Sequence, residues 1–108
     1  MRLRIEKLSE NSFILHGKMK EISDYQDLKL LLEKFRKAKN SEGIVVHFDI
    51  PQARDINPYI LGYWLKLARK DGFKIHLYII SPLLYNNLLR LGMHTFLEIK
   101  NDSMELYL

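Results

Sequence analysis

The chain has 108 residues, of which 47% are hydrophobic, and a formal net charge of +4. This length and composition fit one globular domain with an ordinary core, and no apolar run approaches the roughly 18 residues that a membrane span needs. The chain contains no cysteine, which excludes a disulfide framework, a cysteine-based zinc site and thiol catalysis.

Hydrophobic periodicity and turn residues predict strands that alternate with helices along most of the chain. In chain order the predicted elements are strands at 3–8 and 12–17, a helix at 24–38, a strand at 43–50, a helix at 58–70, a strand at 73–80, a helix at 82–91, a strand at 95–99 and a short closing strand at 104–108. The order β-β-α-β-α-β-α-β predicts a single α/β domain over residues 1–108. We expect a mostly parallel sheet of four to six strands, with right-handed crossovers and with the helices mainly on one face.

Capping signals mark the predicted helix ends. Ser23 is a candidate N-cap of the first helix, with Gln26 three residues later to bond back to it. Asn57-Pro58 and Ser81-Pro82 each place a capping side chain before a proline at the first helical position. Asp71-Gly72 is typical of a helix end.

Two aspartates, Asp49 and Asp55, lie in the loop DIPQARDINP that follows the most strand-like run of the chain. Two carboxylates at the mouth of a parallel sheet could serve acid–base chemistry or bind magnesium. Alternatively, Asp49 ends a strand and Asp55 flanks a helix start, where negative charge meets the positive end of the helix dipole. The loop has no glycine to cradle a phosphate, which favours the second interpretation. We therefore predict no catalytic residue, no cofactor and no metal ligand.

Three histidines form a second candidate group. Because alternate residues of a strand share a face, His16, His47 and His76 are all predicted to lie on the face away from the helices. If the strands lie side by side in sequence order, roughly 4.8 Å apart, the three rings form one row. Such a row could hold a metal ion or titrate as a pH-sensitive patch, and the alternative is three half-exposed positions of amphipathic strands.

Aromatic residues of the predicted helix at 58–70 are candidates for a protein interface. Tyr59 and Tyr63 are four residues apart and share one helical face, whereas core packing explains the neighbouring Trp64. Tyrosine is favoured at interfaces, so we expect Tyr59 and Tyr63 to be partly exposed anchors.

The charge distribution argues against a nucleic-acid surface. Basic residues are spread along the predicted helices, and no aromatic-glycine motif of an RNA-binding sheet is present. The charged start MRLRIE is unlike a signal peptide, and the lack of cysteine fits a reducing compartment. We expect a cytoplasmic protein that neither binds nucleic acid nor inserts into a membrane.

The element order and three segments resemble the STAS domain, the family of anti-sigma-factor antagonists and of the regulatory tails of sulfate transporters. FILHGKM at 13–19 resembles the family's second strand, and GIVVHFDI at 43–50 resembles its third. Residues 71–99 resemble its fourth strand, third helix and fifth strand. The resemblance covers roughly residues 3–100 and implies a bacterial, non-catalytic domain that regulates by binding another protein.

The resemblance also implies that partner contacts come from the loop at 51–57 and the helix after it. The residues implied in these contacts are Gln52, Arg54, Asp55, Asn57, Tyr59 and Tyr63. The family's Asp-Ser-Ser-Gly motif, whose first serine is phosphorylated by a partner kinase, falls on residues 55–58. Ile56 takes the place of that serine, and no serine or threonine lies between Ser41 and Ser81, so the phospho-switch cannot operate at this position.

Three functional hypotheses follow. The first is binding to an anti-sigma factor or a similar kinase, with an affinity that is constitutive or controlled by the partner. The second, also implied by the resemblance, is a soluble subunit on the ATPase of a membrane transporter for lipids or anions. The third is a small metal- or ligand-binding enzyme that uses Asp49, Asp55 or the histidine row. It has the least support, because no nucleophile, base and orienting residue occur together in a recognisable spacing.

Overall fold

A computed structural model describes residues 3–37 and 43–107, in which five strands form one sheet and three α-helices pack against it. The strands are β1 (Arg4–Ser9), β2 (Ser12–His16), β3 (Val45–Ile50), β4 (Lys74–Ile79) and β5 (Glu98–Lys100). The α-helices are α1 (Ile22–Arg36), α2 (Pro58–Lys70) and α3 (Pro82–Arg90), and the 3-10 helices are η1 (Met93–Thr95) and η2 (Met104–Tyr107). No helix in these ranges is long and apolar enough to cross a membrane.

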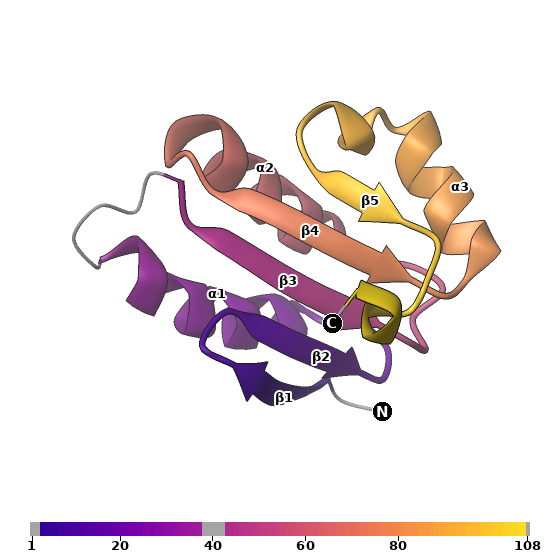
Figure 1. Cartoon of the computed structure of the whole chain (residues 1–108), viewed down its shortest axis with the longest axis horizontal. Coiled ribbons are helices and arrows are strands. Elements are labelled where there is room, and N and C mark those ends of the chain that lie inside the picture. The colour runs from indigo at the N-terminus through magenta and orange to yellow at the C-terminus, as the bar shows by residue number, and fades with distance from the viewer. Residues whose placement is uncertain (1–2, 38–42, 108) are drawn as a thin grey trace.

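The strands lie in the sheet in the order in which they occur in the chain, β1-β2-β3-β4-β5 (Figure 1). β1 and β2 form an antiparallel hairpin, and every later neighbour is parallel, with one α-helix in each crossover. The predicted α/β class and the mostly parallel sheet are therefore confirmed.

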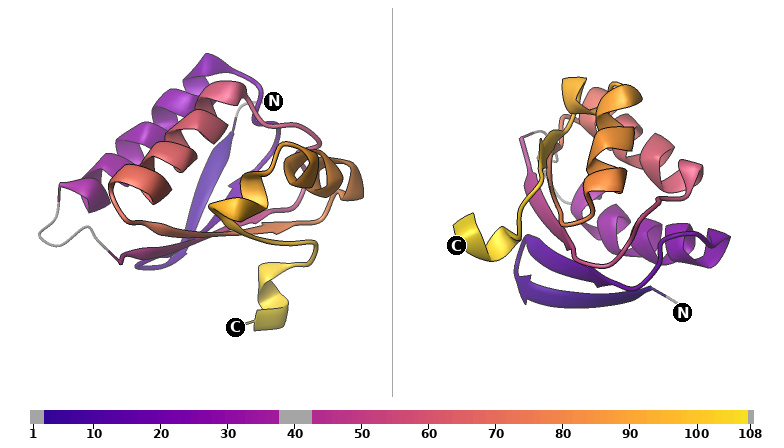
Figure 2. Two further views of the ribbon diagram at one scale, coloured as in Figure 1. Left: turned by 90° about the horizontal axis from the view of Figure 1, so that it is seen from above. Right: turned by 90° about the vertical axis from the view of Figure 1, so that its right-hand side faces the viewer.

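The three α-helices lie on one face of the sheet, and η2 lies on the opposite face (Figure 2). Alternation along the strands sends Phe13, Phe48 and Leu77 into the core, where helical side chains such as Leu28 and Trp64 are also buried. The Trp64 ring stacks on Phe48 with ring centroids 5.4 Å apart. We call the side away from α1, α2 and α3 the helix-free face.

The predicted starts of α2 and α3 are confirmed. The Asn57 side chain accepts a hydrogen bond from the Tyr59 N–H at 2.8 Å, and Ser81 Oγ accepts one from the Leu84 N–H at 3.2 Å. A proline follows each cap at the first helical position. After α3, Gly92 adopts a left-handed conformation with φ of 75°, which ends the helix as its sequence position predicts.

The predicted cap of α1 at Ser23 is wrong, because Glu21 is the N-cap and the helix begins at Ile22. The cause is a buried carboxylate that sequence inspection missed. Asp24 accepts hydrogen bonds from the backbone N–H groups of Glu21 at 3.0 Å and of Leu3 at 3.1 Å. The segment KNSEG at 39–43, which is predicted to end this helix, lies outside the described residues except for Gly43.

The C-terminal predictions need correction. The predicted strand at 95–99 begins later, at Glu98, because Met93–Thr95 form η1. The predicted closing strand at 104–108 is wrong for its described residues, which form η2. Asp49 of β3 accepts a hydrogen bond from the Met104 N–H at 3.1 Å, and this bond holds the segment against the sheet face instead of along a strand edge.

Candidate functional site

The loop at 51–57 connects β3 to α2 and is clamped against the connection between β2 and α1. Gln52 Oε1 accepts a hydrogen bond from the Gly17 N–H at 2.8 Å. Asn57 Nδ2 donates one to the Lys20 carbonyl at 2.8 Å. Gln52 and Asn57, two of the predicted contact residues, thus bond to neighbouring backbone and fix the conformation of the loop.

Ile56, at the position of the family's phosphorylated serine, is buried. Its side chain is 3% exposed, and its backbone forms a parallel β-bridge with Met19. The Met19 carbonyl also accepts the N–H of Asn57 at 2.7 Å. Position 56 therefore supplies a core contact that anchors the loop, and it presents no hydroxyl.

Arg54 and Asp55 are exposed residues of the loop, as is Gln52. Asp55 Oδ1 accepts a hydrogen bond from the N–H of Ile56 at 2.9 Å, which holds the carboxylate beside the start of α2. Asp55 lies on the exposed loop, whereas Asp49 is buried on the helix-free face. In residues 3–37 and 43–107 no group of three or more histidine, aspartate or glutamate side chains could hold a metal ion.

Three tyrosines from α1 and α2 pack together beside this loop. Tyr59 is 63% exposed, and its ring centroid lies 5.8 Å from that of Tyr25. Tyr25 in turn meets the ring of Tyr63 edge-on, with centroids 5.9 Å apart. The expected exposure of Tyr63 is wrong, since α1 covers it and leaves 5% of the residue exposed.

The hydroxyl of Tyr63 reaches across to α1 and donates a hydrogen bond to Glu33 Oε2 at 2.6 Å. This bond lowers the pKa of the Glu33 carboxyl, and nearby Arg36 lowers it further. Burial raises the pKa of the Tyr63 phenol, and the hydrogen bond to Glu33 adds to that shift. Tyr63 is therefore a neutral structural link between α1 and α2 that supports the exposed ring above it.

Helix α1 adds Tyr25, Lys29 and Ile22 to this surface, three residues that the sequence did not identify as candidate contacts. The Tyr25 ring packs against the Tyr59 ring, and the ammonium group of Lys29 lies 5.9 Å from the centroid of the Tyr25 ring. Ile22, one helical turn before Tyr25, is 46% exposed. The signal for Tyr25 was its helical spacing, which identifies a packed face but does not distinguish its rim from its centre.

Asp49 lies under η2 on the helix-free face, with 9% of the residue exposed. Its carboxylate accepts the N–H of Met104, and burial raises its pKa. Asp49 thus has a structural role in fixing η2. The non-catalytic interpretation placed Asp49 at a strand end but did not predict its bond to Met104.

Two of the three histidines are neighbours. His47 and His76 are in register on β3 and β4, and their ring centroids lie 4.7 Å apart. His16 is not in this row, because the register of β2 places Ser12 opposite His47. His16 Nε2 instead lies 2.7 Å from Glu6 Oε1 on the neighbouring strand. The predicted row of three is therefore a pair.

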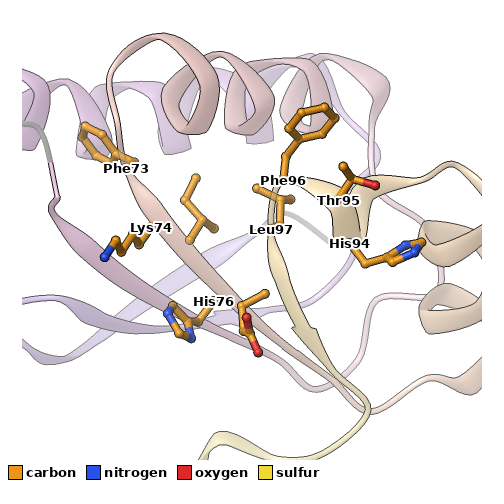
Figure 3. A pocket seen from close by; sticks show the side chains of 9 residues that line it. Phe73, Lys74, His76, His94, Thr95, Phe96 and Leu97 are labelled. Atoms are coloured by element: carbon orange, nitrogen blue, oxygen red, sulfur yellow. The ribbon is translucent and has the colours of Figure 1, made fainter.

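A hollow of about 230 Å³ lies where β4 and the segment at 94–98 separate (Figure 3). His76, His94 and Glu98 are among its lining residues. Figure 3 shows His94 pointing away from His76, so the hollow does not bring these two rings together.

No family model matches the chain, and no curated protein or solved structure is significantly similar to it. The contacts around the loop at 51–57 and the tyrosine cluster are therefore the basis on which a function can be assigned.

Proposed function

We propose that this chain is a cytoplasmic STAS-like domain that acts by binding another protein and catalyses no reaction. The observation that carries the proposal is the exposed ring of Tyr59, which is fixed against Tyr25 beside a clamped loop. The order of strands and helices and the position of the loop before α2 also support the resemblance.

The recognition surface consists of Ile22, Tyr25, Arg54, Asp55 and Tyr59. Tyr59 and Ile22 supply exposed apolar area, and the loop adds one positive and one negative side chain. Aromatic anchors with a polar surround are typical of the few residues that dominate protein interfaces.

The surface is ordered before a partner arrives. Gln52 and Asn57 hold the loop to the backbone of residues 17 and 20, and Tyr63 supports the tyrosine cluster from below. Because little conformational freedom remains to be lost in the loop, more of the contact energy contributes to affinity. Ile56 removes phosphorylation at the usual position, so affinity is constitutive or is set by the partner.

Binding to proteins encoded beside this gene tests the proposal, with affinities measured by calorimetry on the purified full chain. We expect Tyr59→Ala to weaken binding by about tenfold or more, as truncation of an interface anchor does, and Tyr59→Phe to retain most of the affinity. Arg54→Ala and Asp55→Asn should weaken it less, because they lie at a solvated rim.

Leu83→Ala is the matched control, because Leu83 on α3 is 56% exposed and lies outside the recognition surface. It should leave the affinity unchanged. If a triple variant with alanine at positions 54, 55 and 59 binds the same partner as tightly as the wild-type chain, the assignment of this surface is refuted.

A further inference from the structure

The helix-free face carries two adjacent rows of side chains near its centre. His47 on β3 is in register with His76 on β4, and two residues further along Asp49 is in register with Tyr78. Because alternate residues share a face, the four side chains point the same way. η2 lies on this side of the sheet (Figure 2).

η2 is held to the second of these rows by specific contacts. The Met104 N–H donates to Asp49 Oδ1 at 3.1 Å, and the Tyr107 ring packs on the buried Tyr78 ring with centroids 5.5 Å apart. Just before η2, Asn101 Nδ2 donates to the Ile79 carbonyl at 2.7 Å. These contacts fix both ends of the segment.

The histidine pair is linked to the same tyrosine. His47 Nδ1 and the Tyr78 hydroxyl share a hydrogen bond of 2.8 Å. Tyr78 therefore touches His47 through its hydroxyl and Tyr107 through its ring, and His47 also packs against His76. A change in the charge of His47 therefore acts directly on Tyr78, the residue against which η2 packs, and His76 acts through His47.

We propose that η2 is an acid-sensitive latch, which protonation of the His47–His76 pair releases from the helix-free face. A second proton on the pair would place two cations in contact on a partly covered surface, where repulsion is weakly screened. The strain is relieved when His47 rotates away from His76, which breaks its bond to Tyr78 and loosens the support of Tyr107.

Other charged groups around the pair set the balance. Glu98 on β5 is in register with His76 and favours its protonation, whereas Lys74 and Lys100 oppose it. Further titratable groups on this face, from β2, β3, β4 and η2, are His16, Asp49, Tyr78, Glu105 and Tyr107. Lys100 also lies 5.1 Å from the centroid of the Tyr107 ring, so it belongs to the docked arrangement.

The direction of the pH effect follows from burial. Desolvation is the first cause that lowers the pKa of both His47 and His76 below the ordinary value of 6.5. For His47 the second cause is His76 itself. In the proposed latch, release of η2 opens this side of the pair to water and returns the two pKa values towards 6.5. The docked state then binds protons less well than the released state, so release becomes more favourable as the pH falls below 6.5.

The full chain can be titrated by NMR between neutral pH and the acid range in which both histidines become charged. We expect the Met104 amide to lose protection from hydrogen exchange on acidification, after correction for intrinsic exchange rates. Each unit by which the docked state lowers the pKa of His47 or His76 should contribute about a tenfold loss. The Tyr107 ring signals should move over the same range. Fluorescence of the buried Trp64, the single tryptophan, should stay constant and show that the core remains folded.

Three variants separate the histidine pair from other causes. His76→Gln leaves one ring to protonate and should move release to lower pH, and Tyr78→Phe keeps the contact with Tyr107 but should uncouple release from the histidines. Asp49→Asn keeps an acceptor for Met104 but cannot titrate, so it should preserve the pH dependence. His94→Gln, at an exposed histidine on η1, is the matched control and should change nothing.

Any of three results would overturn the latch. The Met104 and Tyr107 signals could stay constant while both histidines titrate. The pH dependence could disappear in Asp49→Asn, which would assign release to that carboxyl. The Trp64 emission could shift together with the Met104 exchange, which would show acid unfolding of the whole chain.

Discussion

Tyr63 of α2 donates its hydroxyl hydrogen to Glu33 of α1 over 2.6 Å, beneath the exposed tyrosine of the proposed recognition surface. Glu33 also accepts hydrogen bonds from Arg36 Nε at 3.0 and 3.1 Å. The two helices that border this surface are thus joined by a hydrogen bond to a charged group, which is stronger than a neutral one.

Tyr63→Phe removes this bond while it keeps the buried ring. We expect the free energy of unfolding to fall by about 1.5 to 3 kcal/mol, the range for hydrogen bonds to charged groups. Urea unfolding followed by Trp64 fluorescence measures the change. Tyr59→Phe is the control, because the Tyr59 side chain is largely exposed. An equal effect of the two substitutions would show that the Tyr63 hydroxyl contributes nothing.

The same bond predicts a pH dependence of stability. The pKa of Glu33 is lowered from 4.5, first by Tyr63, so the ionised carboxylate stabilises the folded chain. This contribution is fully present above pH 4.5 and is lost as the pH falls through the lowered pKa. The difference in unfolding free energy between the wild-type chain and Tyr63→Phe should therefore shrink on acidification. A difference that stays constant down to the acid transition would contradict this origin.

Asn57 caps α2 and also ties the loop to α1, and these two roles can be separated. Asn57→Ala loses the bond from the Tyr59 N–H and the bond to the Lys20 carbonyl, and should cost about 1 to 3 kcal/mol. Asn57→Asp keeps the cap acceptor but loses the donor, and should cost less. Ser81→Ala, which removes the hydroxyl that accepts the Leu84 N–H at the start of α3, provides the reference for capping alone. Urea unfolding of the three variants gives the comparison, and equal losses for Asn57→Ala and Asn57→Asp would assign the whole effect to the bond with Lys20.

Two glycines should respond to alanine in opposite directions. Gly62 lies inside α2, and an added Cβ would meet no heavy atom within 4 Å. Gly62→Ala should raise stability by about 0.5 to 1 kcal/mol, because alanine favours the helix. Gly92 also has open space, but its φ of 75° strains any other residue. Gly92→Ala should therefore lower the thermal midpoint while Gly62→Ala raises it, and shifts of the same sign would refute the argument.

Local sequence signals predicted most of the fold. Asn57-Pro58 and Ser81-Pro82 identify helix starts because a cap acts within one helical turn. Strand alternation correctly placed Phe48 in the core and His47 on the helix-free face, since neighbouring side chains of a strand point to opposite faces. Ser23 was mistaken for the cap of α1 because the bond that orders this start comes partly from Leu3, far away in the chain.

The exposure of the candidate site residues was predicted only in part, because it too depends on contacts between distant segments of the chain. Arg54, Asp55 and Tyr59 are exposed as expected, because a polar loop and the first turn of a helix are usually solvated. Tyr59 and Tyr63 are four residues apart and share a helical face, yet α1 covers Tyr63 and leaves Tyr59 largely exposed. Helical periodicity gives the direction of a side chain but not the extent of the neighbouring helix.

By itself, then, the sequence determined the α/β class, the order of the five strands and three α-helices, the helix starts at Pro58 and Pro82, and the absence of a hydroxyl at position 56. Only the tertiary structure decided that His16 leaves the histidine row and that residues 104–107 lie across the helix-free face. The physical reason is that capping and alternation depend on residues a few positions apart. Strand register and the docking of η2 depend on contacts such as Asp49 with Met104, between segments that the chain brings together only when it folds.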